Sequence, residues 1–380
     1  MIAAIVVLSL RRGAFLLAAL LRRRPLARLD ALPSVAVLIP ARNERAVADR
    51  VLTALARVAY PDGKLRFVLV CDGCLDDTPA IFRAWTLDRS DAEVHELSPS
   101  VGKAAALNAG LRVSASEIVV VLDADLRPTP DFLLKLVQPF GDPRVGAAAA
   151  YLRPANADEN VVARYAAVTT WVHQLVTSAG TDRLALNPPT LGAAAYRRSA
   201  LLEIGGFPEV PVGEDVATSA RLTRRGWRTR FVEDAIVDNT VVSDLRTYWR
   251  QHVRWSRAAF RVHADRQPSS ASLAQRAEMT AASLGYADRL VFVGAIVGAL
   301  VGSVPAWAPL LYLAAPGLEI LAALGKAGVR GRFPWFVFAA VVFFVADILG
   351  SMAAVAIHIA GRPYRWHNPR WAPTADAAAP

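Results

Sequence analysis

The sequence predicts an α/β domain built on a mainly parallel sheet, followed by helices that enter a membrane. Across residues 35–140, short aliphatic runs alternate with segments of helical periodicity. This alternation is typical of βαβ units, in which a helix connects two parallel strands. Beyond residue 290 the chain is almost uncharged over stretches that are long enough to cross a bilayer. We therefore expect the α/β domain over residues 31–242 and a membrane region behind it.

The composition agrees with a membrane-associated protein. Of the 380 residues, 54% are hydrophobic, the mean hydropathy is +0.30 and the formal net charge is +10. A basic balance is compatible with nucleic acid, an anionic membrane or an anionic substrate as partner. The chain shows no resemblance to a compact nucleic-acid-binding module, and its apolar C-terminal segments favour the membrane, so no nucleic-acid partner is expected.

Residues 1–30 are expected to associate with the membrane. The first 21 residues are apolar, but Arg11 and Arg12 interrupt them, and three arginines follow at 22–24. Each uninterrupted apolar run is too short to span a bilayer alone. The segment is therefore a poor transmembrane helix or an interfacial helix. A cleavable signal peptide matches poorly, because its arginines should precede the apolar core.

The first half of the domain shows two strand–helix units. Residues 35–39 and 67–70 are the aliphatic runs expected to form strands. Between them, apolar residues recur every four positions from Val47, which predicts a helix that ends near the Pro-Asp-Gly turn at 61–63. The second strand ends in a single CxxC sequence at 71–74. One pair of cysteines does not complete a zinc site, and a thioredoxin-like redox motif is the alternative.

The most informative stretch is residues 118–125, where five aliphatic residues run into Asp123 and Asp125. Such a run is typical of a strand buried on both faces, and ligands bind beyond the carboxyl ends of strands in open α/β sheets. In an extended backbone, residues i and i+2 point to the same side. Two carboxylates there would suit Mg²⁺ or Mn²⁺ holding a diphosphate. A polar turn without a ligand is the alternative.

Further elements follow from local signals. Gly102 and Lys103 open a helix, although the surrounding residues do not form a P-loop. The N-terminus of a helix favours phosphate, so Lys103 is a candidate phosphate ligand, with a plain surface lysine as the alternative. Residues 141–190 are less regular. The remaining expected elements are a helix after Thr129 and Pro130, a small-residue strand at 191–196, a helix at 216–225 and a strand at 227–232.

Residues 243–265 are expected to form an amphipathic helix at the membrane interface, because aromatic residues and arginines are interleaved along it. An ordinary surface helix of a soluble domain is the alternative. Gln251, Arg254 and Trp255 fall at i, i+3 and i+4 and therefore share one helix face. Arginine and glutamine can donate to a diphosphate, and tryptophan offers a stacking surface for a sugar.

Residues 286–361 are expected to form the transmembrane region. The stretch from 290 to 324 carries one charge, Glu319, and is long enough for two spans divided near 305–309. Residues 333–360 form a further span with one charge, Asp347. The tail at 362–380 is basic and aromatic at its start. Three spans after a cytoplasmic domain would leave this tail outside, against the positive-inside tendency, so one segment could be re-entrant or interfacial.

Six short motifs occur in a characteristic order across roughly residues 35–262. They are Ile39-Pro40-Ala41-Arg42-Asn43-Glu44, Cys71-Asp72-Gly73, Gly102-Lys103 with Leu107-Asn108-Ala109-Gly110, Asp123-Ala124-Asp125, Gly213-Glu214-Asp215, and Gln251-His252-Val253-Arg254-Trp255. With these motifs the chain resembles membrane-bound family 2 glycosyltransferases, which have a Rossmann-like GT-A catalytic domain. The last motif, Q-x-x-R-W, is shared with polysaccharide synthases and with ceramide glucosyltransferase-like enzymes.

The resemblance implies a role for each matched residue. Asp125 would ligate Mg²⁺ or Mn²⁺, and Asp123 would contact the metal or the ribose. Asp72 is matched to the uracil-binding aspartate, and Asn43 and Glu44 to the nucleotide edge of the site. Asp215 would be the general base that takes the proton from the acceptor hydroxyl, and a helix N-cap is its alternative role. The family often has a second aspartate where this chain has Cys71.

The resemblance further implies an inverting enzyme at the cell membrane. It would have several membrane spans and a cytoplasmic catalytic domain, and it would move a sugar from a UDP-sugar to a lipid or a growing polysaccharide. The small membrane region slightly favours a lipid acceptor, because a processive synthase should enclose a polymer channel. The alternative is a catalytically silent, membrane-anchored subunit that binds nucleotide sugars or assists assembly.

Overall fold

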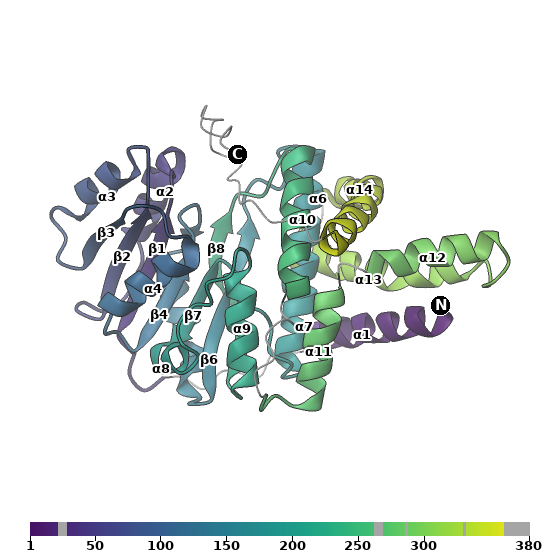
Figure 1. The fold of residues 1–380 in the computed structure, drawn as a ribbon, viewed down its shortest axis with the longest axis horizontal. Helices are drawn as coiled ribbons and strands as arrows, with labels where there is room; N and C mark the ends of the chain where they lie inside the picture. The colour runs from purple at the N-terminus through teal and green to yellow at the C-terminus, as the bar shows by residue number, and fades with distance from the viewer. Residues whose placement is uncertain (22–28, 262–268, 286–287, 330–331, 361–380) are drawn as a thin grey trace.

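The computed structural model describes residues 1–21, 29–261, 269–285, 288–329 and 332–360. Figure 1 shows a sheet with helices on both of its faces, and beside it a group of helices, from which α1 and α12 project away from the sheet. The N-terminal helix lies among the C-terminal helices, so the two ends of the described chain meet in one helical part. The predicted tail at 362–380 lies outside the described residues.

Within the described residues, eight strands form one sheet in the order β3-β2-β1-β4-β7-β6-β8-β5. The pairs β3–β2, β2–β1, β1–β4 and β6–β8 are parallel, and the other three pairs are antiparallel. The predicted parallel sheet is thus the first half of a mixed sheet. The strands are β1 Val35–Ala41, β2 Leu65–Asp72, β3 Ala92–Leu97, β4 Ile118–Leu122, β5 Arg127–Pro128, β6 Val145–Pro154, β7 Ala193–Arg197 and β8 Arg228–Asn239.

Helices cover both faces of the sheet and form the separate helical part. The domain helices are α2 Arg45–Leu55, α3 Thr78–Thr86, α4 Lys103–Val113, α5 Phe132–Leu136, α6 Val161–Trp171, α7 Ala179–Arg183, α8 Arg198–Glu203 and α9 Glu214–Arg224. A 3₁₀ turn at Gln138–Gly141 and a π-helical segment at Val172–Ser178 join some of them. The remaining helices are α1 Ile2–Leu20, α10 Leu245–Arg261, α11 Leu273–Leu284, α12 Asp288–Leu300, α13 Ala308–Ala327 and α14 Phe333–Ile359.

The alternation of side chains along the buried strands builds a core on each face of the sheet. In β1, Val37 packs with the residues of α2, α3 and α5, whereas Leu38 packs with α4, α8 and α9. Successive strand residues point to opposite faces, and both faces are covered, which is why the strand is continuously apolar. A third cluster joins α6, α10, α13 and α14 to the far strands of the sheet.

Two local expectations are corrected by the structure. The strand expected over 118–125 ends at Leu122, and Asp123 begins a turn in which the Leu126 amide donates to the Asp123 carbonyl. The two aspartates are therefore brought together by a turn and not by an extended backbone. The irregular stretch at 141–190 contains β6, whose alanine-rich sequence has only one of the β-branched residues that usually mark a strand, Val145.

Three helices in the described chain are long and apolar enough to cross a membrane, namely α1, α13 and residues 333–357 of α14. A fourth candidate is the pair α11 and α12, which meet at a bend of 67°. The first span expected after residue 290 is thus only the 13-residue helix α12, which is shorter than a bilayer core.

The N-terminal segment forms one continuous helix of 19 residues, although two arginines interrupt its apolar sequence. Both arginines have acidic partners on other helices. Arg11 pairs with Glu278 of α11 at 2.5 Å, and Arg12 pairs with Asp288 and Glu319 at 2.5 Å each. The arginines therefore join α1 to the C-terminal helices, which explains why the helix continues through them.

Candidate active site

The predicted site residues of the first half lie at one edge of the sheet. The strands β1, β2, β3 and β4 run parallel, so their carboxyl ends meet at the same edge. The antiparallel strand β7 begins at this edge, where Ala193 is paired with Leu122 at the end of β4. The segments that follow the parallel strands and the segment that precedes β7 therefore surround one region.

Asn43 and Glu44 connect the ends of β1 and β2. Asn43 adopts a left-handed backbone with φ of 55°, and its Oδ1 accepts a hydrogen bond from the Leu75 amide at 2.7 Å. The Glu44 amide donates to the Thr78 hydroxyl at 2.9 Å. Asparagine tolerates the left-handed region better than most residues. These contacts fix the Asn43 side chain and the Glu44 backbone at the edge where the nucleotide was predicted to bind.

Asp72 is buried and organises the segment before α4. Its carboxylate accepts hydrogen bonds from the Ser100 hydroxyl at 2.8 Å, from the Val101 amide at 2.6 Å and from the Gly102 amide at 3.0 Å. Gly73 allows this close approach, because a Cβ atom there would lie 2.5 Å from the Ser100 nitrogen. Asp72 therefore positions the residues that lead into Lys103.

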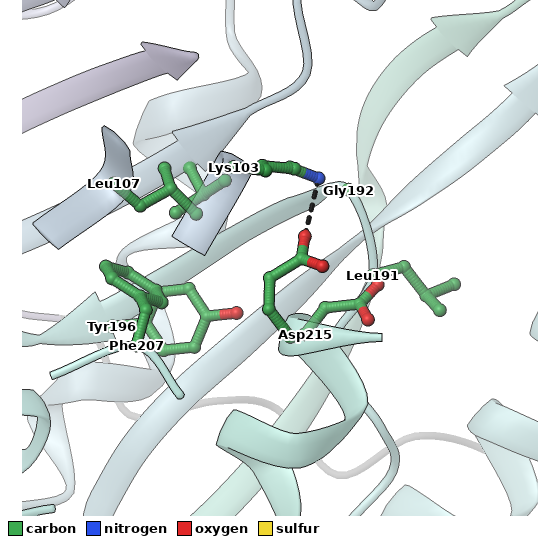
Figure 2. A pocket seen from close by; sticks show the side chains of 9 residues that line it. Lys103, Leu107, Leu191, Gly192, Tyr196, Phe207 and Asp215 are labelled. Atoms are coloured by element: carbon green, nitrogen blue, oxygen red, sulfur yellow. Dashed lines mark ion pairs between the residues drawn. The ribbon is translucent and has the colours of Figure 1, made fainter. Parts of the chain in front are cut away.

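Lys103 lies at the centre of an acidic cluster. Its Nζ atom lies 2.6 Å from Oδ1 of Asp123 and 2.7 Å from Oε1 of Glu214, so it bridges the end of β4 and the start of α9. Figure 2 shows this side chain reaching toward the carboxylates of α9. The side chains of Lys103 and Asp123 are 37% and 32% exposed, and that of Glu214 is 13% exposed. The cluster is thus open enough for a ligand to reach it.

The charges of the cluster shift each other's pKa. Burial acts to lower the pKa of Lys103, but the carboxylates of Asp123 and Glu214 outweigh this effect and raise the pKa well above its usual value. Burial raises the pKa of Asp123, although Lys103 opposes this shift, and the charge of Asp125 adds to it. Burial also acts to raise the pKa of Glu214, but Lys103 and Arg254 lower it below its usual value. Lys103 therefore stays protonated beside the carboxylates.

Asp215 occupies the first turn of α9, beside this cluster. Burial, followed by the charge of Glu214, raises the pKa of Asp215 to about 7. Its Oδ1 accepts a hydrogen bond from the Val216 amide at 2.8 Å. Its carbonyl accepts from the hydroxyls of Thr190 and Ser219, both at 2.9 Å. A carboxylate with a pKa near neutrality can take up a proton during a reaction.

Gly192, immediately before β7, closes the site on the side of Asp123. Its carbonyl accepts from the Asp123 amide at 2.9 Å. A Cβ atom on Gly192 would lie 2.3 Å from Oδ2 of Asp123, so a larger residue would displace that carboxylate. The sequence predicted a close ligand approach at 191–196, and the close approach observed is that of the Asp123 side chain.

A small cavity of about 10 Å³ lies beside Asp215. This volume holds about one water molecule. Apolar and aromatic side chains form one wall, and the charged cluster forms the other (Figure 2). The residues around it are Lys103, Leu107, Val121, Leu191, Gly192, Tyr196, Phe207, Glu214 and Asp215. A sugar would require Lys103 or a neighbouring segment to move.

The helix α10 carries the Q-x-x-R-W residues toward this region. Gln251 and Arg254 are half-buried, whereas Trp255 is 41% exposed. The Nε atom of Arg254 is buried and has no hydrogen-bond partner among the described residues. Because Arg254 also lowers the pKa of Glu214, its charge acts on the same cluster. An unsatisfied guanidinium nitrogen is suited to a phosphate oxygen.

The donor atoms present fit a divalent metal held together with a diphosphate. The described residues contain no group of three or more His, Cys, Asp and Glu side chains arranged for a metal. Mg²⁺ usually takes one or two carboxylates and completes its shell with substrate phosphates and water. Asp123 and Asp125 can supply the carboxylates. Lys103 already places a cation against Asp123 at 2.6 Å, so this position attracts positive charge.

The sequence of residues 33–258 matches the family described as Glycosyltransferase like family 2. This range contains both the sheet edge and the Q-x-x-R-W helix. The chain belongs to this family. The predicted family and the predicted GT-A type of fold, with apolar C-terminal helices behind it, are confirmed.

Curated relatives match about 60% of the chain. The probable glycosyltransferase YdaM of Bacillus subtilis is 30% identical over 60% of this chain and 55% of its own length. An N-acetylglucosaminyltransferase of Neorhizobium galegae is 33% identical over 61% of this chain and 56% of its own length. A beta-monoglucosyldiacylglycerol synthase of Nostoc is 28% identical over 62% and 50%, respectively. The match thus spans about half the length of these three relatives.

A solved structure has a similar fold over nearly the whole chain. The mannosyltransferase PcManGT from Pyrobaculum calidifontis, in complex with GDP-Man and Mn²⁺, superposes with a TM-score of 0.63 at 23% identity. The likeness covers 95% of this chain and 96% of the other. It supports the arrangement of the sheet and of the helical part as one fold.

Sequence reasoning missed Glu214 and Gly192 as parts of the site. Glu214 stands beside Asp215 in the motif already noticed, but the chain alone does not show that it pairs with Lys103 more than a hundred positions earlier. Gly192 was noted only as one of several small residues. Its role depends on the distance to Asp123, which only the tertiary structure shows.

Proposed function

We propose that this chain is an inverting glycosyltransferase that moves a sugar from a UDP-sugar to an acceptor hydroxyl. The observation that carries the proposal is the position of Asp215, which lies beside Lys103, Asp123 and Glu214 at the carboxyl edge of the sheet. Asp215 and Lys103 thus line one small cavity, and Asp123 pairs with Lys103.

The transfer proceeds by one displacement. The acceptor oxygen attacks the anomeric carbon, the bond from that carbon to the diphosphate oxygen breaks, and Asp215 takes the hydroxyl proton. The leaving UDP gains negative charge, which Lys103 and the unsatisfied Nε of Arg254 stabilise. Asp123 and Asp125 would hold a divalent metal, which would supply further positive charge at the diphosphate. Attack from the side opposite the leaving group inverts the anomeric configuration.

The nucleotide is proposed to lie along the ends of β1 and β2. Asn43 and Glu44 are held at this edge by contacts to the segment after β2. Asp72 is engaged with three groups of the segment 100–102. We infer that it acts on the nucleotide partly by fixing this segment and partly through its carboxylate. Relatives named N-acetylglucosaminyltransferases support UDP-GlcNAc as the first donor to test.

The acceptor is proposed to be a lipid at the cytoplasmic face of the cell membrane. The helices α1, α13 and α14 are long and apolar enough to cross a bilayer. Trp255 on α10 is exposed and offers a surface for the acceptor. The relative named as a beta-monoglucosyldiacylglycerol synthase supports a diacylglycerol as the first acceptor to test.

The test is UDP release by the full chain in detergent, with a panel of UDP-sugars and either Mg²⁺ or Mn²⁺. The account predicts release from one donor, with dioleoylglycerol in mixed micelles, and loss of release when EDTA is added. UDP release that continues in EDTA would contradict the proposed dependence on a divalent metal. Firm UDP binding without release from any donor, with lipid or oligosaccharide acceptors, would favour the silent-subunit alternative, and no binding of UDP would overturn the proposal.

A further inference from the structure

The helical part contains an ionic network that reaches the Q-x-x-R-W helix. Asp288 pairs with Arg12 at 2.5 Å and with Arg289 at 2.7 Å. Arg289 in turn lies 3.7 Å from Oδ2 of Asp347 on α14. The Asp347 side chain is 12% exposed. Charged groups on apolar helices are costly unless paired, so those that persist usually have a function.

Asp347 is the member of this network that contacts α10. The Tyr248 hydroxyl donates a hydrogen bond to Oδ1 of Asp347 at 2.8 Å, and Tyr248 is only 2% exposed. The helices α10 and α14 pack against each other (Figure 1). This hydrogen bond fixes α10 against α14 at one defined turn, because separating a buried hydroxyl from its acceptor costs free energy.

From Tyr248, aromatic contacts continue along α10 to Trp255. Tyr248 stacks on His252 with ring centroids 3.9 Å apart, and His252 meets Trp255 edge to face at 5.0 Å. Residues 248, 252 and 255 are spaced i, i+4 and i+7, so they lie on one helix face. The ring of Trp255 is thus oriented by a continuous stack that begins at the Asp347 carboxylate.

We propose that Asp347 and Tyr248 are positioning residues that hold α10 in the register in which Trp255 receives the acceptor. The inference rests on the proposed transfer, since Trp255 is taken to contact the acceptor. Neither residue touches the donor cluster. They act through the orientation of α10, and their loss weakens acceptor use without weakening UDP binding.

The first test is hydrogen–deuterium exchange of the full chain in lipid nanodiscs. Tyr248→Phe and Asp347→Leu are each expected to speed amide exchange in α10 about tenfold, and to leave β4 unchanged. The double variant should exchange no faster than Asp347→Leu alone, because Asp347→Leu already removes the hydrogen bond that Tyr248→Phe removes. Asp347→Asn keeps an acceptor oxygen and should have a smaller effect. The matched control is Tyr312→Phe, whose hydroxyl lies 3.4 Å from Arg289 but on α13.

The second readout is UDP release with UDP-GlcNAc and dioleoylglycerol micelles. Tyr248→Phe is expected to raise the acceptor KM about tenfold while the Kd for UDP stays unchanged. Unchanged exchange in α10 would overturn the inference, and so would faster exchange throughout the chain including β4, which indicates a general loss of stability. A failure of the proposed function can be distinguished from a failure of this inference. In the first case the wild-type chain would release no UDP, and the exchange measurement would still decide the role of the Tyr248–Asp347 hydrogen bond.

Discussion

The sheet edge and the helical part hold their charged residues in opposite ways. At the sheet edge, Lys103 and Asp123 remain about one third exposed although they are paired. In the helical part, the side chains of Asp288 and Glu319 are only 5% and 2% exposed, and both are paired with Arg12. The comparison teaches that similar ion pairs can serve different purposes. Those that solvent reaches can exchange partners with a ligand, whereas those that are enclosed hold helices together.

The largest expected effect on this comparison comes from removing the proposed base at the sheet edge, Asp215. Asp215→Asn keeps the size of the side chain but cannot accept the acceptor proton. Transfer is expected to fall by about 10²- to 10⁴-fold, with the Kd for UDP unchanged. Initial rates of UDP release and calorimetry with UDP check both parts. The control is Asp62→Asn, on an exposed turn far from the site. Equal loss in the control would show that the effect is not chemical.

The enclosed pairs are tested by removing their shared cation. Arg12→Met leaves Asp288 and Glu319 without this partner, and breaking a buried pair costs about 3 kcal/mol of unfolding free energy. Denaturant titration of the detergent-solubilised chain measures the change. Arg50→Met removes an exposed arginine of α2 and should change stability little. Equal stability of the two variants would contradict the assigned difference between enclosed and exposed charges.

The geometry of the sheet edge is tested at Gly192. In Gly192→Ala, the new Cβ atom would lie 2.3 Å from Oδ2 of Asp123, so the carboxylate must move. A displacement of about 1 Å at a reacting site lowers the rate by about 100-fold. Steady-state kinetics measure the loss, and stability should change less than activity. The control is Gly317→Ala on α13, where the added methyl group meets open space. Full activity of the first variant would show that Asp123 tolerates displacement.

The pH dependence of transfer gives a smaller and more specific effect. The pKa of Asp215 is raised to about 7, so its deprotonated fraction falls about tenfold per unit below that pH. The rate should therefore fall as the pH decreases through 7. Glu214→Gln removes the negative charge that raises the pKa of Asp215, so the acidic limb should shift to lower pH. A profile that stays flat from pH 8 to 5 would contradict Asp215 as the base.

Residues at the ends of strands could be predicted because a parallel sheet fixes where its carboxyl ends lie. The apolar runs before Asp72 and Asp123 placed both at one edge, and the structure brings them there. The pairing of Lys103 with Glu214 could not be predicted, since it depends on where α9 begins relative to β4. Likewise, Glu319 and Asp347 were seen only as isolated charges in apolar stretches. Their partners, Arg12, Arg289 and Tyr248, come from distant segments.

The measurement that tests the central claim most directly is the anomeric configuration of the product. The account places one carboxylate, Asp215, as the base of a single displacement. With UDP-α-GlcNAc as donor and dioleoylglycerol as acceptor, the proton NMR spectrum of the glycolipid should show a β linkage. An α linkage would contradict the account, because retention of configuration requires a mechanism other than one displacement assisted by Asp215.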